Sequence, residues 1–196
     1  MQVPKKHFPI IGILGLIAVA AAGGGIYYYQ FILSHASPNF TPSHRLIFIN
    51  ATVVENSVVA PNGHGFEIKN TAFLNQSTLP SFDVNAGPNM TGIKITKYQG
   101  DSDNSTIRAN PGDTITFYIY SVSAPSPPQL MGIPGHGFAI SPTPDNVIGG
   151  PIPGTLDFGH WYSVTATFTN GGTYIYSCTI FCSNGHPSMH GNIVVG

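Results

Sequence analysis

The chain has 196 residues, of which 7 are Lys or Arg and 8 are Asp or Glu, so its formal net charge is −1 with the histidines neutral. This balance excludes a general nucleic-acid binder, which needs a basic stripe to neutralise phosphates. The 23 glycines and 17 prolines interrupt the chain too often for a helical bundle, whereas 12 Phe and 9 Tyr provide apolar surface for a packed core. We therefore expect an all-β fold.

The first predicted element is a membrane span. Residues 8–29 (FPIIGILGLIAVAAAGGGIYYY) carry no charge and are long enough to cross a bilayer as a helix. Lys5 and Lys6 precede them and the next Lys or Arg is Arg45, so the positive-inside rule places the N-terminus in the cytoplasm. A cleaved signal peptide is the alternative, but its apolar part would be shorter, about 7 to 15 residues. Residues 1–33 are thus predicted to be a cytoplasmic stub and single-pass anchor of the cell membrane.

The exported part is predicted to have two regions. Residues 34–104 contain five Asn-x-Ser/Thr sequons, which predict a glycosylation-prone β extension on the outer face. Residues 105–196 are predicted to form the second region. The two regions share a short sequence repeat, because Gly63-His64-Gly65-Phe66 recurs at residues 135–138.

Short segments rich in β-branched and aromatic residues predict strands throughout the exported part. The predicted strands include residues 45–54, 92–98, 114–120, 162–169, 173–177 and 191–195. Ile115, Phe117 and Ile119 alternate with more polar residues, so they are expected on one buried face. The Asn-Gly-Gly sequence at 170–172 predicts a hairpin between the strands on either side of it. Many short strands at this spacing are typical of a sandwich or barrel.

Sulfur and nitrogen donors gather between the last two predicted strands. Cys178, Cys182, His186 and Met189 fall within 12 residues and include both cysteines of the chain. Such soft ligands select copper over magnesium, calcium or manganese, and a Met sulfur beside a His/Cys set is typical of electron-transfer copper. Structural zinc sites instead use four Cys or His ligands. A disulfide is the alternative for an exported cysteine pair, but it would close too short a loop to stabilise the fold much.

The pattern Cys-x3-Cys-x3-His-x2-Met, followed by Gly191 and an apolar strand, resembles the binuclear copper A loop of cytochrome c oxidase subunit II. The resemblance covers roughly residues 105–196 and extends to the Pro111-Gly112-Asp113 turn and to His136-Gly137-Phe138. It implies a cupredoxin-like Greek-key β-barrel or sandwich. The single N-terminal span also resembles the short subunit II of some prokaryotic oxidases.

The resemblance further implies a ligand set for two copper ions. These ligands are His136, Cys178, Ile180, Cys182, His186 and Met189. The two cysteines would bridge the coppers, His136 and Met189 would complete one, and His186 with the backbone carbonyl of Ile180 would complete the other. The family often has a carboxylate at the Ile180 position that helps a magnesium site at the contact with subunit I, and isoleucine cannot take that role.

By this resemblance the chain is the electron-entry subunit of a respiratory haem-copper terminal oxidase, whose subunit I reduces oxygen. The implied partners are subunit I and an external donor, either cytochrome c or a soluble or anchored copper protein. The alternative is a membrane-anchored mononuclear blue-copper carrier that uses His136, Cys182, His186 and Met189. Cys178 discriminates between the binuclear and the mononuclear site, because a mononuclear site does not need this second cysteine. A third alternative is the copper A domain of a nitrous-oxide or nitric-oxide reductase, and the former would need a large additional catalytic domain.

Several further residues could compete for these roles. His64 shares its Gly-His-Gly-Phe context with His136, but only His136 follows the Pro-Gly-Asp turn as in cupredoxins, so we expect His64 on a surface loop. We expect His160 and His190 to be hydrogen-bonded or solvated neighbours of the site and Trp161 to be structural. Phe138 and Phe181 are expected to be core residues.

The copper-bearing half of the chain has very few charges. From Thr114 to the end there is no Lys or Arg, and Asp145 and Asp157 are the acidic residues. We therefore expect the electron donor to dock through an apolar patch formed by residues 125–135 and 148–154 rather than by charge steering.

Overall fold

The computed structural model describes residues 41–53, 65–98, 106–122, 135–149 and 154–196, which belong to one compact unit, Thr41–Gly196. Its strands are β1 (His44–Ala51), β2 (Phe66–Leu74), β3 (Ser81–Asp83), β4 (Gly87–Asn89), β5 (Ile95–Lys97), β6 (Thr106–Ala109), β7 (Asp113–Ser121), β8 (Gly135–Ser141), β9 (Asp145–Gly149), β10 (Gly154–Asp157), β11 (Trp161–Phe168), β12 (Gly172–Ser177) and β13 (His190–Val195). The predicted span at residues 8–29 lies outside the described residues. Among those described, no helix is long and apolar enough to cross a membrane.

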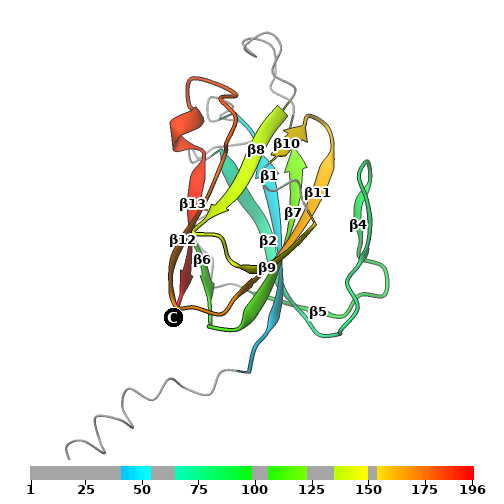
Figure 1. The fold of residues 1–196 in the computed structure, drawn as a ribbon. Coiled ribbons are helices and arrows are strands. Elements are labelled where there is room, and N and C mark those ends of the chain that lie inside the picture. Colours follow the sequence, from blue (N-terminus) through cyan, green and yellow to red (C-terminus); the bar gives the residue numbers. More distant parts are fainter. Residues whose placement is uncertain (1–40, 54–64, 99–105, 123–134, 150–153) are drawn as a thin grey trace, which may run out of the picture. The chain divides into compact units, whose positions relative to one another are not determined.

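Eleven of the thirteen described strands form two sheets that face each other across the main core (Figure 1), and β3 and β4 form a separate two-stranded sheet. One sheet has the order β5-β2-β1-β7-β11-β9 and the other has the order β10-β8-β12-β13-β6. Ile115, Phe117 and Ile119 of β7 are almost completely buried and pack in this core, as their alternation predicts. The all-β sandwich expected from composition and strand pattern is therefore confirmed.

The predicted hairpin around residues 170–172 is wrong. β11 pairs with β7 and β9, whereas β12 pairs with β13 and β8, so the turn carries the chain from one sheet to the other. Phe168 and Tyr174, on either side of the turn, meet edge to face with ring centroids 5.0 Å apart. Alternation identifies the buried face of a strand, but it does not identify the partner strand, because both arrangements bury the same side chains.

Strands from both predicted regions share the core. β1 lies between β2 and β7, and it is parallel to β7 with His44 opposite Thr114. Phe66 of β2 packs in the same cluster of buried residues as Phe117 of β7. A boundary between residues 104 and 105 therefore divides the sequence but does not divide this core.

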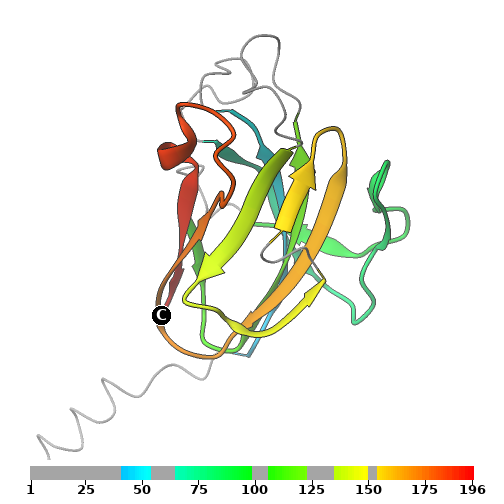
Figure 2. The same cartoon turned by 45° about the horizontal axis from the view of Figure 1, so that its top comes forward.

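The last loop of the sandwich holds the sulfur ligands predicted from sequence. β12 and β13 are antiparallel neighbours with Ser177 opposite His190, so residues 178–189 connect them at one end of the sandwich. This loop contains a single 3-10 turn, His186–Ser188. β12 also pairs with β8, which places the loop beside the start of β8 (Figure 2).

Candidate metal centre

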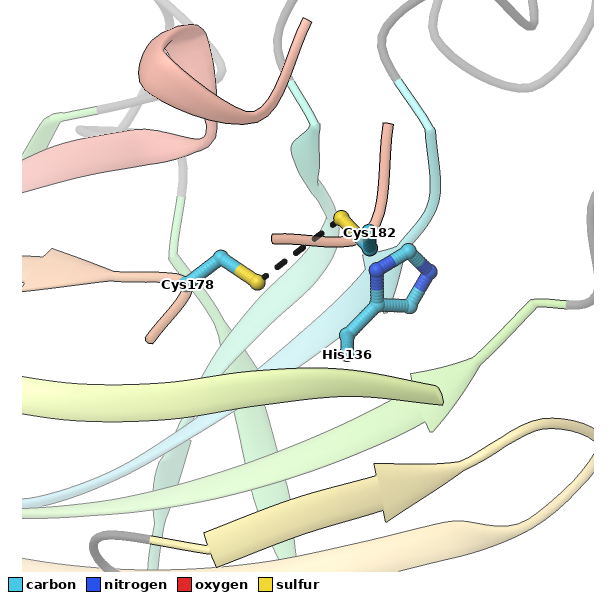
Figure 3. A group of neighbouring side chains, drawn as sticks. All are labelled: His136, Cys178 and Cys182. Atoms are coloured by element: carbon cyan, nitrogen blue, oxygen red, sulfur yellow. Dashed lines mark hydrogen bonds between the residues drawn. The ribbon is translucent and has the colours of Figure 1, made fainter. Parts of the chain in front are cut away.

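One imidazole from β8 and two thiols from the β12–β13 loop form a buried donor cluster. The donor atoms of His136, Cys178 and Cys182 all lie within 4.8 Å of one another, and the three residues are almost fully buried (Figure 3). The two sulfur atoms are 3.9 Å apart, against roughly 2.05 Å for a disulfide, and both thiols are free. The disulfide considered from sequence is therefore not formed, and two sulfur atoms face one imidazole.

Met189 adds a third sulfur atom to this cluster. Its Sδ atom lies 3.1 Å from the Cys182 Sγ atom, and the residue is 1% exposed. Its backbone is held on both sides, because its N–H donates to the His186 carbonyl and its carbonyl accepts from the Cys178 N–H, each at 2.9 Å. The thioether thus lies against one thiol of the pair.

β8 presents His136 between two glycines that allow close packing. A Cβ atom on Gly137 would overlap Thr179 and lie 2.9 Å from the backbone nitrogen of Ile180. The N–H of Gly137 donates to the Cys178 Sγ atom at 3.2 Å. The His136 ring lies edge-on to Phe158 with centroids 5.2 Å apart. Close backbone contact between β8 and the loop therefore sets the distance from imidazole to sulfur.

Both ring nitrogens of His136 are buried and have no hydrogen-bond partner. The Nδ1 atom of His186 is likewise buried without a hydrogen-bond partner. Buried polar atoms without partners are costly and uncommon, and each one needs an explanation. A metal ion bound by the neighbouring thiolates and by one nitrogen of each imidazole would satisfy one of these nitrogens in each ring. The residues present therefore fit a soft metal such as copper.

The backbone carbonyl of Ile180 also faces the sulfur pair. The Cys178 Sγ atom lies 3.2 Å from this oxygen. The carbonyl is thus close enough to the thiols to act as the backbone ligand that the resemblance implies. The role itself stays a prediction, as do those of the five side-chain ligands.

The pKa values of the two thiols shift in opposite directions. A hydrogen bond shared with Cys182 lowers the pKa of Cys178, and contacts with His136 and the Gly137 N–H lower it further, although burial opposes them. The same shared hydrogen bond raises the pKa of Cys182, and burial adds to this increase. The pair thus favours one thiolate and one thiol. A thiolate is the form that binds metal.

One edge of the cluster approaches the protein surface at His186 and Phe181. His186 is only partly buried, and its ring centroid lies 5.6 Å from that of Phe181. Phe181 is 51% exposed, so the expectation that it is a core residue is wrong, whereas Phe138 is fully buried as expected. Phe181 follows the turn out of β12 and has no facing sheet to cover it, which its hydrophobicity alone could not reveal.

The other candidate residues lie outside the donor cluster. The Nδ1 atom of His160 is 3.1 Å from Asn85 Oδ1, and that of His190 is 3.1 Å from the Pro187 carbonyl, so both are hydrogen-bonded neighbours as expected. Trp161 stacks obliquely on Tyr120 and is structural. His64 lies outside the described residues.

The predicted docking patch is only partly described. Residues 125–134 and 150–153 lie outside the described residues. Ile148 is 69% exposed, but it belongs to the edge strand β9, and it lines a groove with Phe82 and Val84 beside the outer face of β11. The groove lined by Ile148 therefore includes neither Phe181 nor His186.

Sequence reasoning missed that β2 lines the donor cluster. A Cβ atom at Gly65, the residue just before β2, would overlap the Met189 side chain, and the ring of Phe66 meets that of Phe138 edge to face. The sequence repeat between residues 63–66 and 135–138 could have indicated this contact, because the Gly-Phe pair of each copy lies at the same site.

Comparisons with known proteins give structural similarities only. No protein-family model matches the chain, and no curated protein sequence is significantly similar to it. The chain is similar to one from a cryo-EM structure of a heme-copper terminal oxidase dimer, with 14% identity, a TM-score of 0.41, and coverage of 94% of this chain and 95% of that one. It is similar to reduced rusticyanin with 18% identity, a TM-score of 0.36, and coverage of 80% and 82%. It is similar to a reduced Cu(I) amicyanin variant with 24% identity, a TM-score of 0.27, and coverage of 48% and 71%.

Proposed function

We propose that the chain is a cupredoxin-like electron-transfer protein that binds two copper ions in a binuclear copper A centre. The observation that carries this proposal is the second buried thiol, Cys178, which lies 3.9 Å from Cys182 and beside His136. His136, Cys182, His186 and Met189 would suffice for a single copper, so a further thiol in the cluster indicates a bridged pair. Two coppers bridged by thiolates would share one electron, which is the chemistry that the centre supplies.

The protein's own residues would keep the donor atoms in place during electron transfer. The cluster is attached to β8 and to the β12–β13 loop, whose backbones are fixed by the Gly137-to-Cys178 and Cys178-to-Met189 hydrogen bonds. Phe138, two positions beyond His136, is fully buried in the same core cluster as Cys178 and Cys182. A rigid, dry site limits rearrangement when the charge changes.

We further propose that this centre is the electron entry of a haem-copper terminal oxidase, acting as its subunit II on the outer face of the membrane. The apolar span at residues 8–29, with Lys5 and Lys6 before it, supports a single anchor with a cytoplasmic N-terminus. Subunit I would receive the electrons and reduce oxygen. An external donor, cytochrome c or a copper protein, would dock at the surface formed by Phe181 and His186.

A membrane-anchored mononuclear blue-copper carrier is the second candidate. Met189 lies against Cys182 rather than Cys178, and this favours a complete set of one thiolate, one thioether and two histidines for a single copper. In that case Cys178 would act only through its hydrogen bonds to Cys182, Gly137 and Ile180.

Copper stoichiometry and electron paramagnetic resonance of the detergent-solubilised full chain distinguish these candidates. We expect two coppers per chain and one unpaired electron coupled to both nuclei. One copper with coupling to a single nucleus would replace this proposal with the blue-copper carrier, and no tight copper binding would overturn both. His136→Ala should abolish the signal. The matched control His160→Ala should retain it, because His160 bonds to Asn85 outside the cluster.

A further inference from the structure

Met189 is the most adaptable donor of the cluster. Its thioether has three rotatable side-chain bonds and can fill irregular space. Its backbone is fixed by hydrogen bonds to His186 and Cys178, but those bonds leave the position of the Sδ atom open. The atoms packed on the side chain therefore decide where the sulfur lies.

Gly65 provides one wall of the Met189 pocket. A Cβ atom at Gly65 would overlap the Met189 Cγ atom and lie 3.0 Å from both its Cβ and Cε atoms. Gly65 is not among the glycines with positive φ in the described chain, so its backbone could accept alanine without strain. The requirement for glycine at this position is the space that Met189 occupies.

This wall cannot move away easily. The Gly65 carbonyl accepts a hydrogen bond from the Thr52 N–H at 2.8 Å, which ties it to the end of β1. The next residue, Phe66, is fully buried and packs edge to face on both Phe138 and Tyr176, with centroids 5.7 Å apart in each case. A side chain added at Gly65 would therefore displace Met189 rather than the backbone of β2.

We propose that Gly65 is a positioning residue that holds the Met189 thioether against the metal site and thereby sets the reduction potential of the centre. This inference rests on the proposed copper function. The axial ligand tunes the potential of cupredoxin-type copper. A thioether donates electron density and stabilises the oxidised form, so a change in its distance from the metal changes the reduction potential.

The test compares Gly65→Ala with Gly171→Ala in the copper-loaded full chain. Gly171 also lacks a positive φ, and its added Cβ would meet only the Val195 carbonyl oxygen at 3.4 Å, so this variant is the matched control. We expect Gly65→Ala to shift the potential and to change the visible absorption, while Gly171→Ala leaves both unchanged. An unchanged potential in folded Gly65→Ala would overturn the proposal.

A double-mutant cycle with Met189→Leu shows whether the effect passes through the thioether. Once the thioether is gone, adding Gly65→Ala should no longer shift the potential. The same shift in both backgrounds would overturn the proposal. If Gly65→Ala alone does not fold, adding Met189→Ala should restore folding, because the new methyl group then occupies vacated space, and a failure of this rescue would count equally against it.

A metal-free measurement separates this proposal from the proposed function. In the apo-protein, the ¹³C-methyl resonance of Met189 should shift in Gly65→Ala but not in Gly171→Ala. Copper binding failure in the wild-type chain with this shift present would reject the copper function and retain the contact. A resonance that does not shift would reject the positioning role itself.

Discussion

The rings of Phe66 and Phe138 meet edge to face with centroids 5.7 Å apart, and both side chains are fully buried. Phe66 belongs to β2 and Phe138 to β8, so the contact joins the two sheets. Phe138 lies two positions after His136 and therefore points to the same side of β8. The base of the donor cluster is thus built by both sheets, including a strand from the part of the chain predicted to be an extension.

Phe66→Ala should therefore weaken both the fold and the metal site. Removing a fully buried Phe typically costs about 3 to 5 kcal/mol, because it loses apolar burial and leaves a cavity. Urea unfolding of the apo-protein measures the loss. Ile175→Ala, at a position 45% exposed, should cost well under half as much. Equal losses in the two variants would show that Phe66 does not support the core.

Cys178→Ser should reduce the copper content from two ions to one per chain. A serine hydroxyl is a poor ligand for copper and cannot bridge two ions as a thiolate can. Metal analysis together with electron paramagnetic resonance should then show coupling to a single copper nucleus. The neighbouring change Ser177→Ala should keep two ions. Retention of two coppers and a shared electron in Cys178→Ser would exclude a bridging role for this residue.

Tyr118 should make the fold sensitive to alkaline pH. Burial raises its pKa to about 12, from about 10 in an unfolded chain. Because the folded state disfavours the phenolate, this contribution to stability is complete below pH ~10 and is lost as the pH rises towards 12. Urea unfolding between pH 8 and 12 should show a shallower decline for Tyr118→Phe than for the wild type. Identical slopes would contradict the assignment.

Electron entry should depend on Phe181 and only weakly on salt. The half of the chain after Thr114 has no basic residue and two acidic ones, so it offers no acidic patch to steer a basic donor. In stopped-flow experiments with reduced cytochrome c, we expect the second-order rate to fall less than about tenfold as salt shortens the Debye length below ~10 Å. Phe181→Ala should slow the reaction, and Ile148→Ala should not. A steep salt dependence would instead indicate docking through acidic residues such as Asp101 and Asp103.

Local patterns predicted much of this structure. The alternation of Ile115, Phe117 and Ile119 correctly identified the buried face of β7, because a strand's period depends only on its own residues. The spacing of Cys178, Cys182 and Met189 placed three sulfur atoms in one loop between adjacent strands. His136 joins them through the pairing of β8 with β12, and the resemblance anticipated this residue.

Contacts between distant segments could not be predicted in this way. The hairpin at residues 170–172 failed because a turn sequence does not specify whether the next strand stays in the same sheet. Gly65 was missed because a glycine's role beside a methionine depends on packing across the core. Phe181 was assigned to the core because hydrophobicity does not indicate whether a loop residue has a covering neighbour.

The two parallel strand pairs have a consequence for how fast this chain can fold. β1 pairs with β7 and β6 pairs with β13, and in each case the partners are far apart in sequence. Neither pair can form by extending a local turn, so the chain must close long loops before these contacts contribute any stability. Proteins with such a high contact order fold in milliseconds to seconds rather than microseconds. Until the sheets enclose them, the two thiols that the native structure buries almost completely are exposed to solvent.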